Sequence, residues 1–444
     1  MTITAREAAL RALIAYRRKR AWPDLALGGL IDRSGVSKRN TALARQIVGG
    51  VMQNMALCDY YISQFSSIDL KKIEPCVLDI LRLSVYQLLF LSGIPHSAAV
   101  NEGVELAVKY SNSRAAGFAN AVLRKIAGAS ENNCLPEITG ETERCLSIRY
   151  SHPEWLIHSL CKMLGANDAE ALLKSHNATD TPVTAQVNTL IANTNDVLSM
   201  LEADGVKAMR REWPDDCIDI RGTGRIDRLK AFMNGCIYIQ DTAARLAITA
   251  AGPEPGNLVI DGCAAPGGKS FAAAIAMQNK GKIIACDINA VKLSRVEENA
   301  SRLGIGIITT ALRDALSMDI SLEGGADIVL ADVPCSGFGV IRKKPEVRYK
   351  TESEIAGLPA VQRELLSALS GYVKPGGILL YSTCTILQSE NEAVIEWFLD
   401  SHGGFRAEPF SLPVIGDVED GMITLWPHIH GTDGFFICKM KRLV

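Results

Sequence analysis

The sequence lacks an apolar run long enough to span a membrane, which takes roughly 18 residues. The longest candidate, residues 85–91, is interrupted by Gln87. Near the N-terminus, the basic cluster at 17–20 follows the apolar stretch, which is the reverse of the order in a secretory signal. We therefore expect a cytoplasmic protein with no membrane partner.

Closely spaced cysteine pairs are also missing, because none of the 12 cysteines belongs to a C-x-x-C pair. Disulfide frameworks and zinc sites are normally recognised by short, regular cysteine spacings. The sequence therefore predicts neither disulfides nor a metal site, and most of these cysteines should pack as small buried side chains.

The chain carries a net charge of only −2, but its charges are unevenly distributed. Residues 1–130 hold 17 lysines and arginines against 9 aspartates and glutamates. Such an excess is typical of a module that meets nucleic-acid phosphates, and equally of a solvated helical surface. With 48% apolar and 22% charged residues over 444 positions, we expect a folded protein of two or three domains.

Residues 1–128 show the periodicity of amphipathic helices. Leu43, Ile47 and Val51 recur at every fourth position, which places them on one helix face. Gly128 can end the last helix of this region. An all-α domain is the predicted result.

The remaining chain divides into two further predicted parts. Residues 129–235 begin with a polar connector and continue as a small α+β unit of RRM-like character. Residues 236–444 alternate short apolar strands with helices, which predicts a Rossmann-like α/β domain with a parallel, doubly wound sheet. Its strands are expected at 257–261, 282–287, 306–312, 326–332 and 376–382, with a final antiparallel hairpin at 423–426 and 434–441.

A turn of small residues connects the first of these strands to an alanine-rich helix, where open α/β sheets bind ligands. Small side chains let the backbone approach a cofactor, and the helix N-terminus offers unpaired amides. The spacing fits neither a Walker A loop nor the dinucleotide fingerprint, because Gly268 stands where the former needs lysine and Ala264 where the latter needs glycine. The candidate cofactor-binding residues of the turn are Cys263, Ala264, Ala265, Pro266, Gly267, Gly268 and Lys269.

Two carboxylates follow the next two strands. Asp287 ends the second strand, from which a carboxylate can accept both hydroxyls of an adenosine ribose. Asp314 follows the third strand and could accept a hydrogen bond from an adenine amino group. Both are predicted to bind cofactor, although a loop carboxylate can also simply cap the following helix.

Two cysteines follow neighbouring strands on the same side of the sheet. Asp332 ends one strand and Cys335 lies just beyond it, while Cys384 follows another. Two cysteines and a carboxylate beside a cofactor loop favour chemistry over packing.

These segments resemble those of a known family. DGCAAPGGKS (261–270), ADVPCSGFGVIRKKPEVR (331–348) and YSTCT (381–385) are similar to the signature segments of the Nol1/Nop2/Sun RNA cytosine-C5 methyltransferases, from about residue 150 onward. The segments 95–110 and 117–126 resemble the NusB RNA-binding fold. The combination is similar to methyltransferases of small-subunit (16S) ribosomal RNA.

The resemblance implies S-adenosyl-L-methionine as cofactor and RNA, here small-subunit ribosomal RNA, as partner of a monomeric enzyme. It implies that Cys384 attacks C6 of the cytosine and that Cys335 assists release of the product. It further implies that Asp332 hydrogen-bonds the base at N3 and also contacts the cofactor, and that Lys269 contacts substrate or cofactor.

Several alternatives stay open at this point. DNA cytosine methyltransferases place the nucleophile after a proline, which would nominate Cys335 instead of Cys384. A noncatalytic antitermination-type RNA-binding factor, a transfer-RNA methyltransferase of the same family and an NAD-dependent oxidoreductase are the competing functions. The last lacks the glycine fingerprint, and nitrogen methylation is disfavoured because the motif at Asp332 lacks an N-P-P-Y-type aromatic residue.

Basic residues near the first cysteine motif are expected to contact RNA phosphates. They are Arg342, Lys343, Lys344 and Arg348, joined by arginines of the N-terminal domain. His428 and His430 have no third ligand nearby, so a structural hairpin is favoured over a metal site. Phe435 and Phe436 are expected to be the core and surface faces of one strand.

Overall fold

The computed structural model describes residues 3–444 apart from residues 20, 35–37, 223 and 318. Contacts divide the chain into two compact units. The first comprises Met1–Asn177 together with Lys344–Tyr349, and the second comprises Ala178–Lys343 and Lys350–Val444. In the part of the chain described, no helix is long and apolar enough to cross a membrane.

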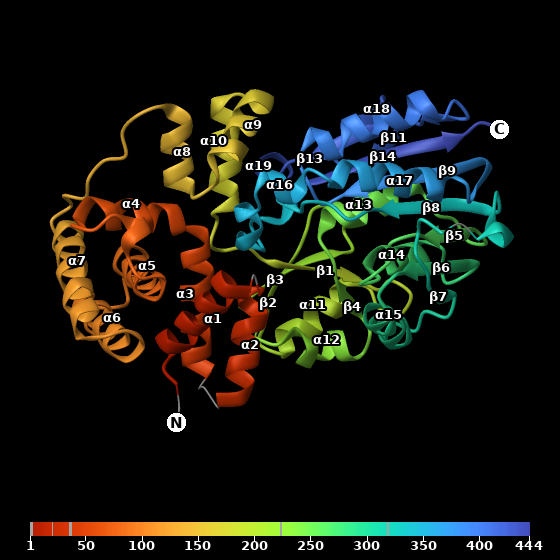
Figure 1. The fold of residues 1–444 in the computed structure, drawn as a ribbon. Coiled ribbons are helices and arrows are strands. Elements are labelled where there is room, and N and C mark those ends of the chain that lie inside the picture. The colour runs from red at the N-terminus through yellow and green to blue at the C-terminus, as the bar shows by residue number, and fades with distance from the viewer. Residues whose placement is uncertain (1–2, 20, 35–37, 223, 318) are drawn as a thin grey trace. The chain divides into compact units, whose positions relative to one another are not determined.

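The first unit is helical (Figure 1, red to yellow). Its core includes Ile47 and Val51, both fully buried, which confirms the helical face predicted from their spacing. The helices are α1 Ala5–Lys19, α2 Pro23–Ser34, α3 Lys38–Gln53, α4 Met55–Phe65, α5 Pro75–Phe90, α6 His96–Tyr110, α7 Ser113–Glu131, α8 Thr142–Tyr150, α9 Glu154–Leu164 and α10 Ala166–His176.

Two details of this unit differ from the prediction. Helix α7 continues past Gly128 to Glu131, because Gly128 keeps helical geometry and the left-handed turn falls at Asn133 (φ 52°), after the C-cap Asn132. The expected connector contains helix α8, which packs against α4 and α9. The first compact unit therefore extends to Asn177, and the domain boundaries at 128 and 235 stay predictions.

The second unit opens with a small antiparallel sheet in the order β2-β3-β1-β4. Strand β2 was not predicted, because its edge position leaves most of its side chains exposed and no apolar alternation marks it. The elements are β1 Val183–Val187, α11 Thr194–Ala203, β2 Lys207–Arg210, β3 Cys217–Arg221, α12 Lys230–Met233 and β4 Ile237–Ile239.

The larger sheet has the order β10-β14-β9-β8-β5-β6-β7, with β13 also paired to β14. The strands from β9 to β7 are parallel, as predicted, and β14 adds to β9 in the antiparallel direction. The strands are β5 Leu258–Asp261, β6 Lys282–Asp287, β7 Ile308–Leu312, β8 Ala326–Asp332, β9 Val373–Thr383, β10 Phe405–Ala407, β13 Met422–Leu425 and β14 Phe435–Arg442, beside a separate hairpin of β11 Phe410–Leu412 and β12 Gly416–Val418.

Helices cover both faces of this sheet, as Figure 1 shows. One core forms against α13 Thr242–Ala251, α14 Gly268–Ala276 and α15 Ala290–Arg302, and the other against α17 Leu358–Ser370 and α18 Glu392–Ser401. The Rossmann-like fold class is thereby confirmed. This layering leaves the carboxyl ends of the parallel strands as the place where loop residues meet.

Candidate active site

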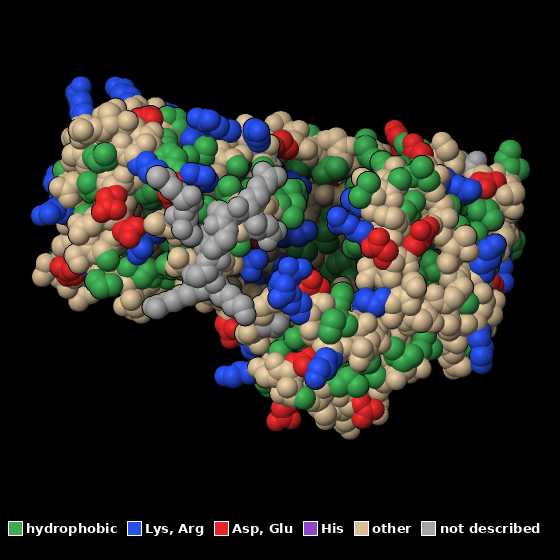
Figure 2. Space-filling view, turned by 90° about the horizontal axis from the view of Figure 1, so that it is seen from below, with side chains coloured by type: hydrophobic (Ala, Val, Ile, Leu, Met, Phe, Trp, Pro, Cys, Tyr) green, Lys and Arg blue, Asp and Glu red, His purple; other side chains and the backbone are tan. Residues whose placement is uncertain are grey.

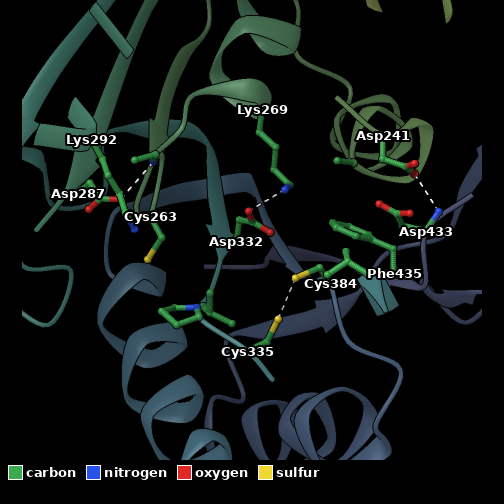
Figure 3. A pocket seen from close by; sticks show the side chains of 15 residues that line it. Asp241, Cys263, Lys269, Asp287, Lys292, Asp332, Cys335, Cys384, Asp433 and Phe435 are labelled. Atoms are coloured by element: carbon green, nitrogen blue, oxygen red, sulfur yellow. Dashed lines mark hydrogen bonds and ion pairs between the residues drawn. The ribbon is translucent and has the colours of Figure 1, made fainter. Parts of the chain in front are cut away.

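A cavity of about 410 Å³ lies within the second unit, at the carboxyl ends of β5, β6, β8 and β9 (Figure 3). Both predicted cysteines and several predicted cofactor residues line it. The lining residues are Asp241, Ala244, Cys263, Ala265, Lys269, Asp287, Lys292, Asp332, Val333, Pro334, Cys335, Val340, Cys384, Asp433 and Phe435.

The two cysteines lie next to each other in the lining of this cavity. Strands β8 and β9 are parallel neighbours with Asp332 in register with Ser382, so the turns after both strands emerge side by side. The Sγ atoms of Cys335 and Cys384 are 3.2 Å apart, and Figure 3 shows the side chains pointing toward one another. At this separation one sulfur can donate a hydrogen bond to the other.

The surroundings of Cys335 favour its protonated form. The hydrogen bond with Cys384 and burial hold the pKa of the Cys335 thiol well above its usual range, and the negative charges of Glu390 and Asp332 act in the same direction. Cys335 therefore keeps its proton at neutral pH and can donate it toward the sulfur of Cys384.

Lys269 and Asp332 form an ion pair at the cavity wall. Lys269 Nζ is 2.7 Å from Asp332 Oδ2, and Ser382 Oγ donates a 2.9 Å hydrogen bond to Asp332 Oδ1. The same ammonium group lies 5.0 Å from the centroid of the Phe435 ring. Lys269 is largely buried, so it is a cavity residue and not a solvated lysine at a helix start.

The turn between β5 and α14 is shaped by its glycines. Gly267 has a φ of 104°, which L side chains rarely adopt, and it caps α14. A Cβ on Gly262 would lie 2.4 Å from Leu369 Cδ2, so a side chain there would require the Leu369 side chain on α17 to move. Of the predicted turn residues, Cys263, Ala265 and Lys269 line the cavity, whereas Ala264, Pro266, Gly267 and Gly268 form the backbone behind it.

The structure separates the two carboxylates predicted to bind cofactor. Asp287 lines the cavity and is fixed by backbone donors, with Ala265 N at 3.2 Å from Oδ2 and Asn289 N at 2.9 Å from Oδ1. Asp314 is exposed, lies outside the lining, and accepts a 3.0 Å bond from Leu316 N. The structure thus brings Asp287, but not Asp314, to the cavity.

A buried charged cluster at the cavity edge was missed from the sequence. Lys343 Nζ lies 2.5 Å from Asp241 Oδ2 and 2.9 Å from Asp433 Oδ2, and Asp433 N donates to Asp241 Oδ1. Burial raises the pKa of Asp433 to about 6, whereas Lys343 keeps the pKa of Asp241 low despite burial. The only sequence signal for this cluster is that Asp241, Lys343 and Asp433 all lie in the part of the chain that resembles the family.

Comparison with known proteins identifies the family. Residues 248–441 match the model of the 16S rRNA methyltransferase RsmB/F, residues 3–128 match the NusB family, and residues 152–227 match the ferredoxin-like domain of RsmF/B-like methyltransferases. A probable ribosomal RNA small subunit methyltransferase B of Bacillus subtilis is 35% identical over 99% of both chains. The chain belongs to the RsmB/F family of 16S ribosomal RNA methyltransferases.

Solved structures agree with this membership. The crystal structure of PH0851 is 30% identical and aligns with a TM-score of 0.83 over 100% of both chains. A methyltransferase homolog from Pyrococcus horikoshii is 29% identical and aligns with a TM-score of 0.59 over 69% of this chain and 100% of its own. The predicted combination of a NusB-like domain with a Nol1/Nop2/Sun domain, as in RsmB, is confirmed, and the RsmB/F family implies S-adenosylmethionine as cofactor and RNA as substrate.

The expected RNA contact of Arg348 in this RsmB/F chain is wrong. Arg348 is fully buried, and its Nη1 donates to Gln53 O, Tyr150 O and Asn177 Oδ1 within the first unit. Lys343 belongs to the carboxylate cluster. Figure 2 shows lysine and arginine side chains spread among carboxylates over one face of the molecule, with no single large basic patch.

The C-terminal phenylalanines also differ from expectation. Phe435 and Phe436 are both buried, because each faces a core on its side of the sheet, so neither is a surface residue. Phe435 also lines the cavity of this RsmB/F domain. His430 accepts a 2.8 Å bond from Trp426 N, and no group of three metal ligands occurs among the residues that the structure describes.

Proposed function

We propose that the protein transfers a methyl group to C5 of a cytosine in small-subunit ribosomal RNA, through a covalent bond between Cys384 and C6 of the base. The observation that carries the proposal is the pair of sulfurs 3.2 Å apart in a cavity shared with Asp332 and the loop after β5. A noncatalytic RNA-binding factor would have no use for this arrangement.

The cavity suits S-adenosylmethionine by the chemistry of its side chains. Asp287 presents a carboxylate, positioned by two backbone amides, that can accept ribose hydroxyls. Cys263 and Ala265 line the cavity with small side chains, and Lys292 adds a positively charged side chain to the lining. When bound, the cofactor supplies an electrophilic sulfonium methyl group. We retain Asp314 as a candidate adenine contact, on its position after β7 alone.

Cytosine C5 is too weakly nucleophilic to take a methyl group directly, so the base must first be activated. In the proposed reaction Cys384 sulfur forms a bond to C6, and the C5=C6 electron pair becomes available at C5. Lys269 and Asp332, 2.7 Å apart, would hold the N3 edge of the base and supply a proton as negative charge develops there. C5 would then take the methyl group, whose bond to the sulfonium sulfur breaks and leaves a neutral thioether.

The final step removes the C5 proton and returns the N3 proton to Lys269, and the electron pair reforms C5=C6 as the bond to Cys384 sulfur breaks. Cys335 stands next to Cys384 and is assigned to this release, as base or as assistant. As assistant, Cys335 would donate its proton to the departing Cys384 sulfur, while water takes the C5 proton and then reprotonates Cys335.

The roles of the two cysteines can be tested with radiolabelled cofactor and small-subunit ribosomal RNA. We expect Cys384→Ala to abolish both methylation and covalent RNA adduct, because the bond to C6 cannot form. Cys335→Ala should accumulate a covalent RNA complex on a denaturing gel, because release is blocked.

The reverse pattern, with adduct accumulating in Cys384→Ala, would assign the nucleophile to Cys335. Cys134→Ala is the control, because this exposed cysteine belongs to the first unit and lies outside the cavity lining. Bisulfite sequencing of ribosomal and transfer RNA from cells lacking the protein would test the substrate. A signal lost only from transfer RNA would contradict the proposal.

We also propose that the protein acts as a monomer, because one chain supplies every side chain that lines the cavity. Size-exclusion chromatography with light scattering tests this directly. A stable dimer at micromolar concentration would contradict it.

A further inference from the structure

Glu390 lies behind the cavity and outside its lining. It ends the 3-10 helix Gln388–Glu390, between β9 and α18, and its side chain is buried. The Tyr381 hydroxyl donates a 2.6 Å bond to the backbone oxygen of Glu390, so the main chain is fixed as well. A buried carboxylate needs strong partners, and its partners here belong to the cysteine turns.

The Glu390 carboxylate connects both turns. Ser336 N, directly after Cys335, donates a 2.8 Å bond to Oε2, and Thr385 Oγ1, directly after Cys384, donates a 3.4 Å bond to Oε1. The hydroxyls of Ser336 and Thr385 are themselves 2.7 Å apart. Ser336 and Thr385, the residues directly after the two cysteines, therefore both bond to the Glu390 carboxylate.

A side chain from helix α17 completes this connection. Gln362 is fully buried, and its Nε2 donates 2.9 Å to Glu390 Oε2 and 3.0 Å to Pro334 O. The donors to the carboxylate are thus a backbone amide, a side-chain amide and a hydroxyl, all of them neutral. These bonds fix the position of the carboxylate, but none of the three donors carries a positive charge that would form an ion pair with it.

We infer that Glu390 is a positioning residue that ties the Cys335 turn to the Cys384 turn, sets the distance between the two sulfurs, and keeps the proton of the pair on Cys335. The catalytic use of this arrangement rests on the proposed function, because only a reaction in which the two cysteines have different roles requires one of them to stay protonated. Its geometry and its charge can be tested without RNA or cofactor.

The charged groups around Cys335 support this division. The pKa of Cys335 is raised by the hydrogen bond to Cys384, by burial, and by the charges of Glu390 and Asp332. Lys269 pairs with Asp332, and Lys350 Nζ donates 2.8 Å to Ser336 O on the same turn. The remaining titratable neighbour, Tyr381, is buried with a pKa well above its usual range and so stays neutral. In the part of the chain that the structure describes, the donors to the Glu390 carboxylate are neutral, and its charge adds to that of Asp332 in raising the pKa of Cys335.

The first test measures the initial rate of iodoacetamide alkylation at Cys335 against pH, by peptide mapping of the full-length protein. We expect Glu390→Gln to move the midpoint of the Cys335 profile to lower pH, because the substitution removes the charge and keeps a hydrogen-bonding amide of similar shape. Glu392→Gln is the matched control. Glu392 lies two residues after Glu390, but its carboxylate accepts a hydrogen bond from Thr424 Oγ1 on β13 and not from the cysteine turns. An unchanged midpoint in folded Glu390→Gln would overturn the charge role.

The second test measures the distance between the sulfurs, through the rate at which diamide oxidises Cys335 and Cys384 to a disulfide. The reagent takes up the two electrons and two protons that the thiols lose. Thr385→Val removes the hydroxyl that joins the turns but keeps the Glu390 charge, and should slow this reaction about 10-fold through misplacement of the sulfurs.

A Thr385→Val protein that oxidises at the native rate would overturn the positioning role, and this variant remains informative if Glu390→Gln does not fold. Methylation assays on the same variants separate this inference from the proposed function. If the thiol measurements behave as expected and no variant or native protein methylates cytosine, the proposed function fails while the positioning by Glu390 stands.

Discussion

At the scale of single residues, Asp261 shows how burial near a functional loop creates pH dependence. Its carboxyl group is fully buried at the end of β5, and Ser270 Oγ donates a 2.7 Å bond to it. Burial raises the pKa of Asp261 to about 7, although the Ser270 bond acts in the opposite direction. The folded protein therefore binds a proton at pH values where the unfolded chain has released it.

This linkage predicts a change of stability with pH. Between about pH 4 and 7 the folded state holds one more proton at Asp261 than the unfolded state, so its contribution to stability falls as pH rises, by at most about 1.4 kcal/mol per pH unit. Asp261→Asn should flatten this part of the profile, measured by urea denaturation at several pH values. Asp227→Asn, at an exposed position, is the control, and equal slopes in Asp261→Asn and the native protein would contradict the prediction.

At the scale of elements, two glycines set the approach of β14 to the Cys384 turn. Gly339 N donates 2.9 Å to Cys384 O, and Gly434 N donates 2.8 Å to Gly339 O. A Cβ on Gly339 would lie 1.8 Å from Gly434 O and 2.8 Å from Cys384 O. These are backbone atoms, which cannot move aside as the end of a flexible side chain can, so the contact requires glycine.

We therefore expect Gly339→Ala to destabilise the protein by about 1–3 kcal/mol and to lower methylation more than stability alone explains, because the turn that carries Cys384 must move. Thermal denaturation and a methylation assay at a temperature well below the transition measure the two effects. Gly357→Ala is the matched control, since a Cβ there meets no atom within 4 Å. A fully active Gly339→Ala protein would show that the turn tolerates the shift.

The elements also show what can be predicted from sequence. The parallel strands β5, β6 and β8 were found because buried strands are continuous apolar runs, and their order places Asp287, Asp332 and Cys335 at one edge. The insertion of β14 beside β9 was not predicted, because antiparallel addition to a parallel sheet leaves no local pattern. That insertion brings Asp433 and Phe435 into the cavity, which explains why both were missed.

At the scale of the whole molecule, neighbours in sequence belong to different compact units. Lys343 ends a segment of the second unit and bonds Asp241 and Asp433 there, whereas Lys344–Tyr349 belongs to the first. Sequence reasoning placed Arg348 at the RNA site because it lies close to Cys335 along the chain. Distance along the chain says little here, because the partners of Arg348 are up to 295 residues away.

Arg348 yields a prediction about the stability of the first unit. Its side chain is fully buried, burial lowers its pKa to about 10, and Nη1 alone serves three acceptors at 2.8–2.9 Å. A lysine ammonium at position 348 is too compact to reach the same oxygens, so the acceptors at the ends of α3 and α8 and at Asn177, which follows α10, lose their donor. We expect the free energy of unfolding to fall by about 2–3 kcal/mol and hydrogen exchange to become faster in peptides that cover those helix ends.

Hydrogen exchange in α14 of the second unit should stay at the native rate. Arg149→Lys, whose half-exposed side chain pairs with Glu170 at 3.6 Å, should cost no more than about 0.5 kcal/mol. Native protection of α10 in Arg348→Lys would show that the three bonds contribute little, because a buried guanidinium costs nearly as much to desolvate as its bonds return.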